Sequence, residues 1–464
     1  MEAYSLLFAV LASSLAGAGV GLCTGLVPGL HVNNVAAVVV AGSASAVSAF
    51  GALGSLFGCV DAAVLISSFL VAALVAHMFS ESIVATYLGI PSGDTVSLLP
   101  AHRLARMGLG GAAVRASADG SLSGAALGLL LLPSVCLILG PPVDAYSSIR
   151  QVMGIVVALM SAALVVSDGL GHGDPVRRAV LASTFFLVSG LLGFIVLDTN
   201  YYACEVPDFP WIHGGFVRAS SLLLPLFAGL FGVPTLLLSL GSRGEVKGDA
   251  DEGSPRRYRI DTDLRPKEVV LSSLGGLLVG WIPGMTSGSS ATMCASISKD
   301  AAPEGGGPEE AARFIWLYSA ISSCGAVLSV GALFVISRAR SGIMQAVVHF
   351  LGDKTLHMDG LWSVTPMAAM LMSMLLSAAV CHRLICGMSA TTISRLQRML
   401  CSDNAAVLSL AFVTSLVLCL TGVRGALLFV AAGSLGLLPP MSGVRRINLM
   451  GCLLVPICVT FLFG

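Results

Sequence analysis

Long apolar runs separated by short polar segments dominate this chain. A transmembrane helix needs about 20 mostly apolar residues, and the runs that approach or exceed this length are 5–27, 51–76, 115–139, 150–167, 179–199, 219–242, 268–282, 311–337, 361–386, 405–419, 422–437 and 444–463. Shorter apolar pieces, interrupted by Gly, Pro or polar residues, lie at 30–48, 82–100, 285–297 and 342–352. They predict half-helices or re-entrant segments, so we expect an all-α, polytopic membrane protein with about ten to twelve transmembrane helices.

The composition agrees with this pattern. Only 11% of the 464 residues are charged and 56% are hydrophobic, whereas roughly 25% of an ordinary soluble domain is charged. The formal net charge of zero argues against a nucleic-acid binder, which would carry a basic stripe. The 12 cysteines form no C-x-x-C pair, so the sequence predicts no cysteine-based zinc site and no disulfide framework.

One long polar segment, 243–267, divides the chain into two hydrophobic halves, 1–242 and 268–464. The segment contains a cluster of basic residues: Arg243, Lys247, Arg256, Arg257, Arg259, Arg265 and Lys267. Lys and Arg in short loops mark the cytoplasmic side of a membrane protein. We therefore expect a cytoplasmic linker between two transmembrane halves, in a multi-pass protein of the cell membrane.

The same short pattern opens each half. Residues 21–29 read G-L-C-T-G-L-V-P-G and residues 276–284 read G-L-L-V-G-W-I-P-G, so both follow G-x-x-x-G-x-x-P-G. Two copies in one frame indicate an internal duplication, and we expect an inverted repeat with broken or re-entrant helices. Proline removes a backbone donor and glycine permits unwound conformations, which a membrane protein tolerates only where the break is buried or lines a wet cavity.

Polar residues follow both breaks and a third one. A broken helix leaves backbone N–H groups at the start of the next half-helix, and these favour an anion. The candidate substrate-binding residues are Pro28, Gly29, Leu30, His31, Asn33, Asn34, Pro91, Ser92, Gly93, Thr95, Pro283, Gly284, Thr286, Ser287, Gly288, Ser289 and Ser290. For the two P-G breaks the competing interpretation is an ordinary kink with Gly/Ser packing between helices. For residues 91–95 it is a turn at the membrane interface.

Ionisable residues inside apolar runs are functional candidates by default. Asp94, in the third break, and Asp119, at the start of an otherwise apolar span, are the candidates for binding a coupling cation, Na⁺ or H⁺. His77 and Glu81 are one helical turn apart, so their side chains are expected to face each other. A wet position at the end of a span is the alternative for this pair.

Several stretches, taken in order, resemble one known family. They are P-G at 28–29, G-I-P-S-G-D-T at 89–95, H-R-L-A-R-M-G-L-G-G at 102–111, G-F-I-V-L-D at 193–198, L-F-A-G-L-F-G at 226–232, P-G at 283–284 and G-V-R-R-I-N-L-M-G-C-L-L-V-P at 443–456. The chain resembles the large permease subunit of tripartite tricarboxylate transporters, the TctA-type family, and most of all its archaeal branch.

This resemblance implies secondary transport of small organic anions, such as di- or tricarboxylates, driven by an ion gradient. It also implies a small membrane subunit and an extracytoplasmic solute-binding protein as partners. The residues after each P-G pair and the 91–95 loop would then line the substrate site. A homo-oligomer is compatible with this organisation.

Two other classes of function compete with this interpretation. A translocase for a polyprenyl-phosphate lipid carrier would use the same broken helices to hold a phosphate headgroup, with His31 and Arg103 or Arg106 as partners. An intramembrane enzyme is disfavoured because the chain has no H-E-x-x-H, G-x-S-G, D-D-x-x-D or Walker A motif. We therefore predict a permease without a cofactor.

Overall fold

The structure is a computed structural model of the chain. It describes residues 2–27, 30, 32–58, 60–88, 98–141, 143–169, 174–198, 220–241, 266–282, 285–298, 301, 307–352, 361–389 and 403–463, together with residues 392, 395, 396 and 399.

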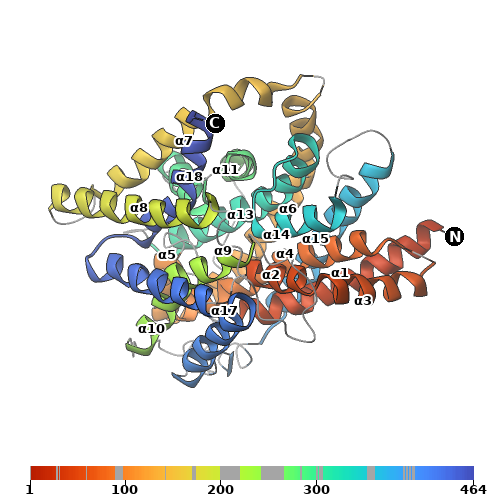
Figure 1. Ribbon diagram of the computed structural model, residues 1–464, viewed down its shortest axis with the longest axis horizontal. Helices are drawn as coiled ribbons and strands as arrows, with labels where there is room; N and C mark the ends of the chain where they lie inside the picture. The colour runs from red at the N-terminus through yellow and green to blue at the C-terminus, as the bar shows by residue number, and fades with distance from the viewer. Residues whose placement is uncertain are drawn as a thin grey trace.

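Over these residues the regular elements are helices (Figure 1). The first half contains α1 (Glu2–Gly25), α2 (Val32–Ala41), α3 (Ser43–Leu56), α4 (Ala62–Leu88), α5 (Leu98–Arg106), α6 (Gly110–Leu139), α7 (Ala145–Gly169), α8 (Pro175–Asp198), α9 (Ser220–Phe227), the π-helical turn η2 (Ala228–Gly232) and α10 (Val233–Gly241). The second half contains α11 (Pro266–Trp281), α12 (Ser287–Ser298), α13 (Pro308–Ile336), α14 (Gly342–Leu351), α15 (Leu361–Cys386), α17 (Asp403–Met441), the 3₁₀ turn η4 (Arg446–Met450) and α18 (Gly451–Phe463).

The described residues contain 9 helices long and apolar enough to cross a membrane, or 10 if the bent pair α2–α3 counts as one span. This all-helical, multi-span architecture was predicted, but the count lies at or below the lower end of the expected range. Three of the predicted spans form shorter helices. The predicted span 219–242 is divided into α9, η2 and α10, with an apolar helix only at Leu224–Leu238. Helix α11 has only 16 residues, and Ala406–Cys419 is a short apolar helix before the kink at Gly422.

The predicted span 51–76 is wrong in its boundaries because the chain turns inside it. Gly58 has φ +88, a left-handed conformation that glycine adopts at little cost and that ends α3. The Asp61 side chain then accepts a hydrogen bond from the Ala63 N–H at 2.9 Å, as an N-cap residue does at a new helix. The interruption predicted within 30–48 is confirmed, since α2 and α3 meet at an angle of 91°.

Glycines allow α1 to pack directly against α4. The Ser13 hydroxyl donates to the Leu65 carbonyl at 2.6 Å, between residues 52 positions apart. Three glycines farther along α1 face α4 residues that also come 52 positions later in the sequence: Gly17 faces Phe69, Gly21 faces Ala73 and Gly25 faces His77. A Cβ atom on any of these glycines would overlap the α4 backbone. Because the sequence separation stays constant along the contact, the two helices run parallel, with their backbones in close approach.

The second half repeats this arrangement with the second copy of the motif. Gly276 and Gly280 of α11 pack against Cys324 and Leu328 of α13, so α11 and α13 also run parallel. Gly120 and Gly124 of α6 likewise face the Trp316 and Ala320 carbonyls of α13. The packed helices α6 and α13 therefore share a direction, and they lie in the middle of the bundle (Figure 1).

The two motif helices run in opposite directions. Tyr87, in the last turn of α4, lies against Gly110, the first residue of α6, so these two long spans are antiparallel. Since α1 is parallel to α4, and α11 is parallel to α13 and α6, α1 and α11 point opposite ways. Helices α7, α8 and α18 form a separate group far from the N-terminus (Figure 1), in which Gly193 of α8 lies against the Cys452 backbone of α18.

The glycine packing predicts a large difference between two substitutions on one helix. Gly21 is buried against the Ala73 carbonyl, whereas an added Cβ at Gly19 meets nothing within 4 Å. We expect Gly21→Val to destabilise the protein by about 1–3 kcal/mol through overpacking. Gly19→Val makes the same residue change on the exposed face and serves as the control. Thermal unfolding of both variants in detergent measures the difference, and equal melting temperatures would contradict the close α1–α4 contact.

Candidate functional site

Helix α1 ends beside a buried histidine. The Thr24 hydroxyl lies 3.1 Å from Nδ1 of His77, and Nε2 of the same ring lies 3.6 Å from Oε2 of Glu81. His77 is 1% exposed and Glu81 26%, so this pair extends from the interior toward a more open position. The predicted facing of His77 and Glu81 is confirmed, and the structure adds that the first helix break begins next to them.

The residues after the first break are only partly described. Pro28, Gly29 and His31 lie outside the described residues. Leu30 is buried in an apolar cluster with residues of α9, η2 and α17, and Asn34 is 5% exposed. Asn33 packs against α14, since a Cβ on Gly342 would lie 3.0 Å from its side chain. The start of α2 is therefore enclosed by other helices rather than open to lipid.

A positive charge precedes the segment that Asn33 touches. Arg340 lies in the connection between α13 and α14, two residues before Gly342. Loss of hydration on burial lowers the pKa of its guanidinium to about 10, and Tyr146 opposes part of this effect. The group therefore stays charged at neutral pH, so a cation lies close in sequence to the segment beside the first break.

The second motif copy forms a helical hairpin. Three hydrogen bonds join α11 to α12: Ser290 to the Gly275 carbonyl at 3.1 Å, Cys294 to Leu271 at 3.4 Å and Lys267 to Ser298 at 2.9 Å. As the residue number rises along α12, the residue number of its partner on α11 falls, so the two helices are antiparallel. With 16 and 12 residues, the arms are about 24 and 18 Å long, shorter than a hydrocarbon core of about 30 Å. This is the geometry of a re-entrant hairpin.

The polar residues at its tip have two different roles. Thr286 caps α12, because its hydroxyl oxygen accepts a hydrogen bond from the Ser289 N–H at 3.1 Å and lies 3.0 Å from the Ser289 hydroxyl. Ser290 is fully buried and holds the two arms together. Ser287 and Ser289 are partly exposed and Gly288 is buried, while Pro283 and Gly284 lie outside the described residues.

The third predicted break also falls outside the described residues. Pro91, Ser92, Gly93, Asp94 and Thr95 belong to the segment between α4 and α5. The described chain around it turns back on itself, since Nδ1 of His102 in α5 lies 3.2 Å from the Thr86 carbonyl of α4. The proposed roles of the 91–95 residues stay predictions.

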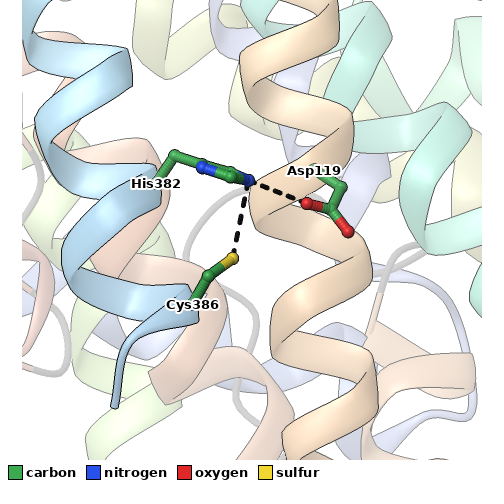
Figure 2. Close-up of side chains that lie close together, drawn as sticks. All are labelled: Asp119, His382 and Cys386. Atoms are coloured by element: carbon green, nitrogen blue, oxygen red, sulfur yellow. Dashed lines mark hydrogen bonds and ion pairs between the residues drawn. The ribbon is translucent and has the colours of Figure 1, made fainter. Parts of the chain in front are cut away.

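Asp119 meets a histidine and a cysteine from α15. Its Oδ1 lies 2.8 Å from Nε2 of His382, and the Cys386 Sγ lies 3.5 Å from the same nitrogen (Figure 2). Figure 2 shows the three side chains converging in the space between α6 and α15. His382 is 24% exposed and Asp119 45%, so the cluster is accessible rather than sealed within the core.

This cluster lies level with the first helix break. Ser377 of α15 donates to the Ala72 carbonyl of α4 at 2.8 Å. A second contact, at 2.8 Å between Ser14 of α1 and Ser373 of α15, shows that α15 runs parallel to α1 and hence to α4. His382 comes five residues after Ser377 on α15, and His77 comes five residues after Ala72 on α4, where it lies beside the end of α1. The candidate coupling residue and the first break thus share one depth in the bundle.

His382 and Cys386 were missed in the sequence. They are 263 residues from Asp119 at the closest approach, and no local motif joins them. The available signal was their own spacing, four residues apart on an apolar helix, which places both on one face.

The chain matches the Tripartite tricarboxylate transporter TctA family over residues 11–451, nearly its whole length. It belongs to that family. As a member of the TctA family it is a multi-pass membrane transporter and not an enzyme, as the sequence predicted. The uncharacterized protein MJ1079 of Methanocaldococcus jannaschii is 23% identical over 462 residues, which cover 96% of this chain and 97% of the relative. No solved structure matches the chain.

The hairpin geometry predicts that Ser290 is structural. In Ser290→Ala the Gly275 carbonyl loses an interhelical donor, and we expect a loss of about 0.5–1.5 kcal/mol of stability. Ser296→Ala is the matched control, because Ser296 is exposed on the same helix and bonds only within it, to the Thr292 carbonyl. Thermal unfolding compares them, and a melting temperature for Ser290→Ala equal to that of Ser296→Ala would contradict this role.

Proposed function

We propose that the chain is a secondary-active transporter of small organic anions, di- or tricarboxylates, which bind at the helix breaks. The observation that carries the proposal is that both motif copies end a helix inside the bundle, each packed through paired glycines on a parallel span. Family membership supports tricarboxylates as the substrate class.

The second break supplies donors suited to a carboxylate. The N-terminus of a helix is the positive end of its dipole, which favours an anion. In α12 the first turn carries the hydroxyls of Ser287 and Ser289 beside the Thr286 cap. We assign Thr286, Ser287, Gly288 and Ser289 to carboxylate binding, while Ser290 shapes the hairpin that presents them.

The first break supplies a polar environment of a different kind. His77, Glu81 and Thr24 lie where α1 ends, and Asn33 and Asn34 follow at the start of α2. We assign these two asparagines, together with Leu30, His31 and the P-G pair, to the other side of the substrate site. Arg340, two residues before the Gly342 that Asn33 contacts, is the cation that we assign to balance a second carboxylate.

The coupling cation is assigned to Asp119 and Asp94. The Asp119 carboxylate lies 2.8 Å from Nε2 of His382, at the depth of the first break, and this position supports its assignment. The coupling ion is a proton or sodium, and the uptake measurement distinguishes the two.

The opposite directions of α1 and α11 support an inverted repeat. Related halves of opposite orientation are common among secondary transporters, whose sites lie at broken helices between the halves. We propose that residues 1–242 and 268–464 are such halves and that 243–267 joins them on the cytoplasmic side. The tripartite family further suggests a small membrane subunit and an extracytoplasmic solute-binding protein as partners.

Citrate uptake into sealed vesicles that contain the protein tests this function. We expect accumulation above protein-free vesicles under an inward proton or sodium gradient, and the gradient that drives it identifies the coupling ion. Ser287→Ala removes a donor to a charged group, worth about 1.5–3 kcal/mol, so the half-saturating citrate concentration should rise by about tenfold or more.

Ser296→Ala, on the exposed side of the same helix, should leave the citrate dependence of uptake unchanged. Vesicles that accumulate no carboxylate under either gradient would contradict the proposed transport. Equal half-saturating concentrations in Ser287→Ala and Ser296→Ala would instead contradict the placement of the site.

A further inference from the structure

Asp119, His382 and Cys386 bring an oxygen, a nitrogen and a sulfur ligand to one point between two helices. Their ligand atoms all lie within 4.8 Å of one another. We propose that this cluster binds a single divalent transition-metal ion of the zinc type. The proposal concerns metal binding to the folded protein and does not depend on transport activity. It uses Asp119, to which the proposed function assigns the coupling cation, so a bound metal ion and the coupling cation would compete for this carboxylate.

The distances suit such an ion. Bonds of about 2.0–2.3 Å from zinc to oxygen, nitrogen and sulfur, in tetrahedral geometry, place neighbouring ligand atoms roughly 3.3–3.7 Å apart. The His382 nitrogen is already 3.5 Å from the Cys386 sulfur. Its distance of 2.8 Å to Asp119 is that of a hydrogen bond, so opening this contact by about half an ångström admits the ion.

The helices hold the ligands with little freedom. His382 and Cys386 are four residues apart on α15, so they share one face of the helix. Asp119 is supplied by α6, which is fixed by its glycine contacts with α13. An ion bound here would join α6 to α15 and stabilise the packing of two helices that are distant in sequence.

The chemistry of the donors selects the class of metal. Imidazole and thiolate ligands suit zinc and its first-row neighbours, whereas magnesium and calcium prefer oxygen ligands alone. The Cys386 thiol is not in a disulfide, so its sulfur is available as a metal ligand. Three protein ligands at a partly exposed site leave a fourth position for water.

Cobalt(II) binding to the tag-free, detergent-purified chain tests the site, because a thiolate ligand gives cobalt a charge-transfer absorption. We expect one equivalent of cobalt to produce this band and zinc to displace it. Zinc should also raise the melting temperature of the wild-type protein, since an ion that binds only the folded state stabilises it by mass action.

The variants separate this site from other thiols. His382→Gln and Asp119→Asn should lose at least tenfold in cobalt affinity, and Cys386→Ser should lose the band. Cys386→His should retain zinc stabilisation without the band, because imidazole replaces the thiolate. The controls are Cys381→Ser, buried on the same helix, and Cys419→Ser, an exposed thiol elsewhere, and both should behave as wild type.

Loss of the band in Cys419→Ser, or its persistence in Cys386→Ser, would overturn the proposal. So would the absence of any band or zinc-induced stabilisation in the wild-type protein. Unfolding curves without metal show whether each variant is folded, and Cys386→His provides a gain of metal-induced stability over Cys386→Ser that a folding defect cannot imitate.

Discussion

Inside a bilayer, each backbone N–H and C=O group must find its partner within the protein, because lipid offers none. A chain with two P-G breaks in apolar helices therefore needs other helices packed tightly around each break. The glycines of G-x-x-x-G-x-x-P-G meet this requirement. They bring α1 onto the backbone of α4 and α11 onto α13 just before each helix ends, so one short motif encodes both the break and the packing that encloses it.

The chain continues differently after each of the two breaks. After the first, the chain enters the short helix α2, which packs on α14. After the second, it folds back as the α11–α12 hairpin, held by hydrogen bonds to helix carbonyls. Polar residues collect at both places, and the Asp119–His382 contact lies level with the first. The proposed carboxylate site and the residue proposed for the coupling cation therefore belong to one helical scaffold.

The sequence predicted the features that depend on residues close together in the chain. Apolar run length predicted the long spans, and the duplicated motif predicted where helices end. The pairing of His77 with Glu81 followed from helical spacing. The interruption at Gly58 and Asp61 was missed because hydrophobicity alone does not reveal a turn inside an apolar run.

Contacts between residues far apart in the sequence could not be predicted from the sequence. Nothing near Asp119 in the sequence indicates His382 or Cys386, since tertiary packing of α6 on α15 joins them. The role of Ser290 likewise depends on the hairpin: in sequence it is one of several small polar residues after a P-G pair, and only its bond to Gly275 distinguishes it from Ser287.

The most direct test of the central claim, that the helix breaks bind a carboxylate, is thermal unfolding of the purified protein with citrate or with a polyprenyl phosphate. A ligand at 100 times its Kd stabilises the folded state by about 2.7 kcal/mol. The carboxylate site predicts a higher melting temperature with citrate, enhanced by the coupling cation, and no shift with the lipid phosphate. A shift with polyprenyl phosphate alone would contradict the claim and identify a lipid-carrier translocase instead.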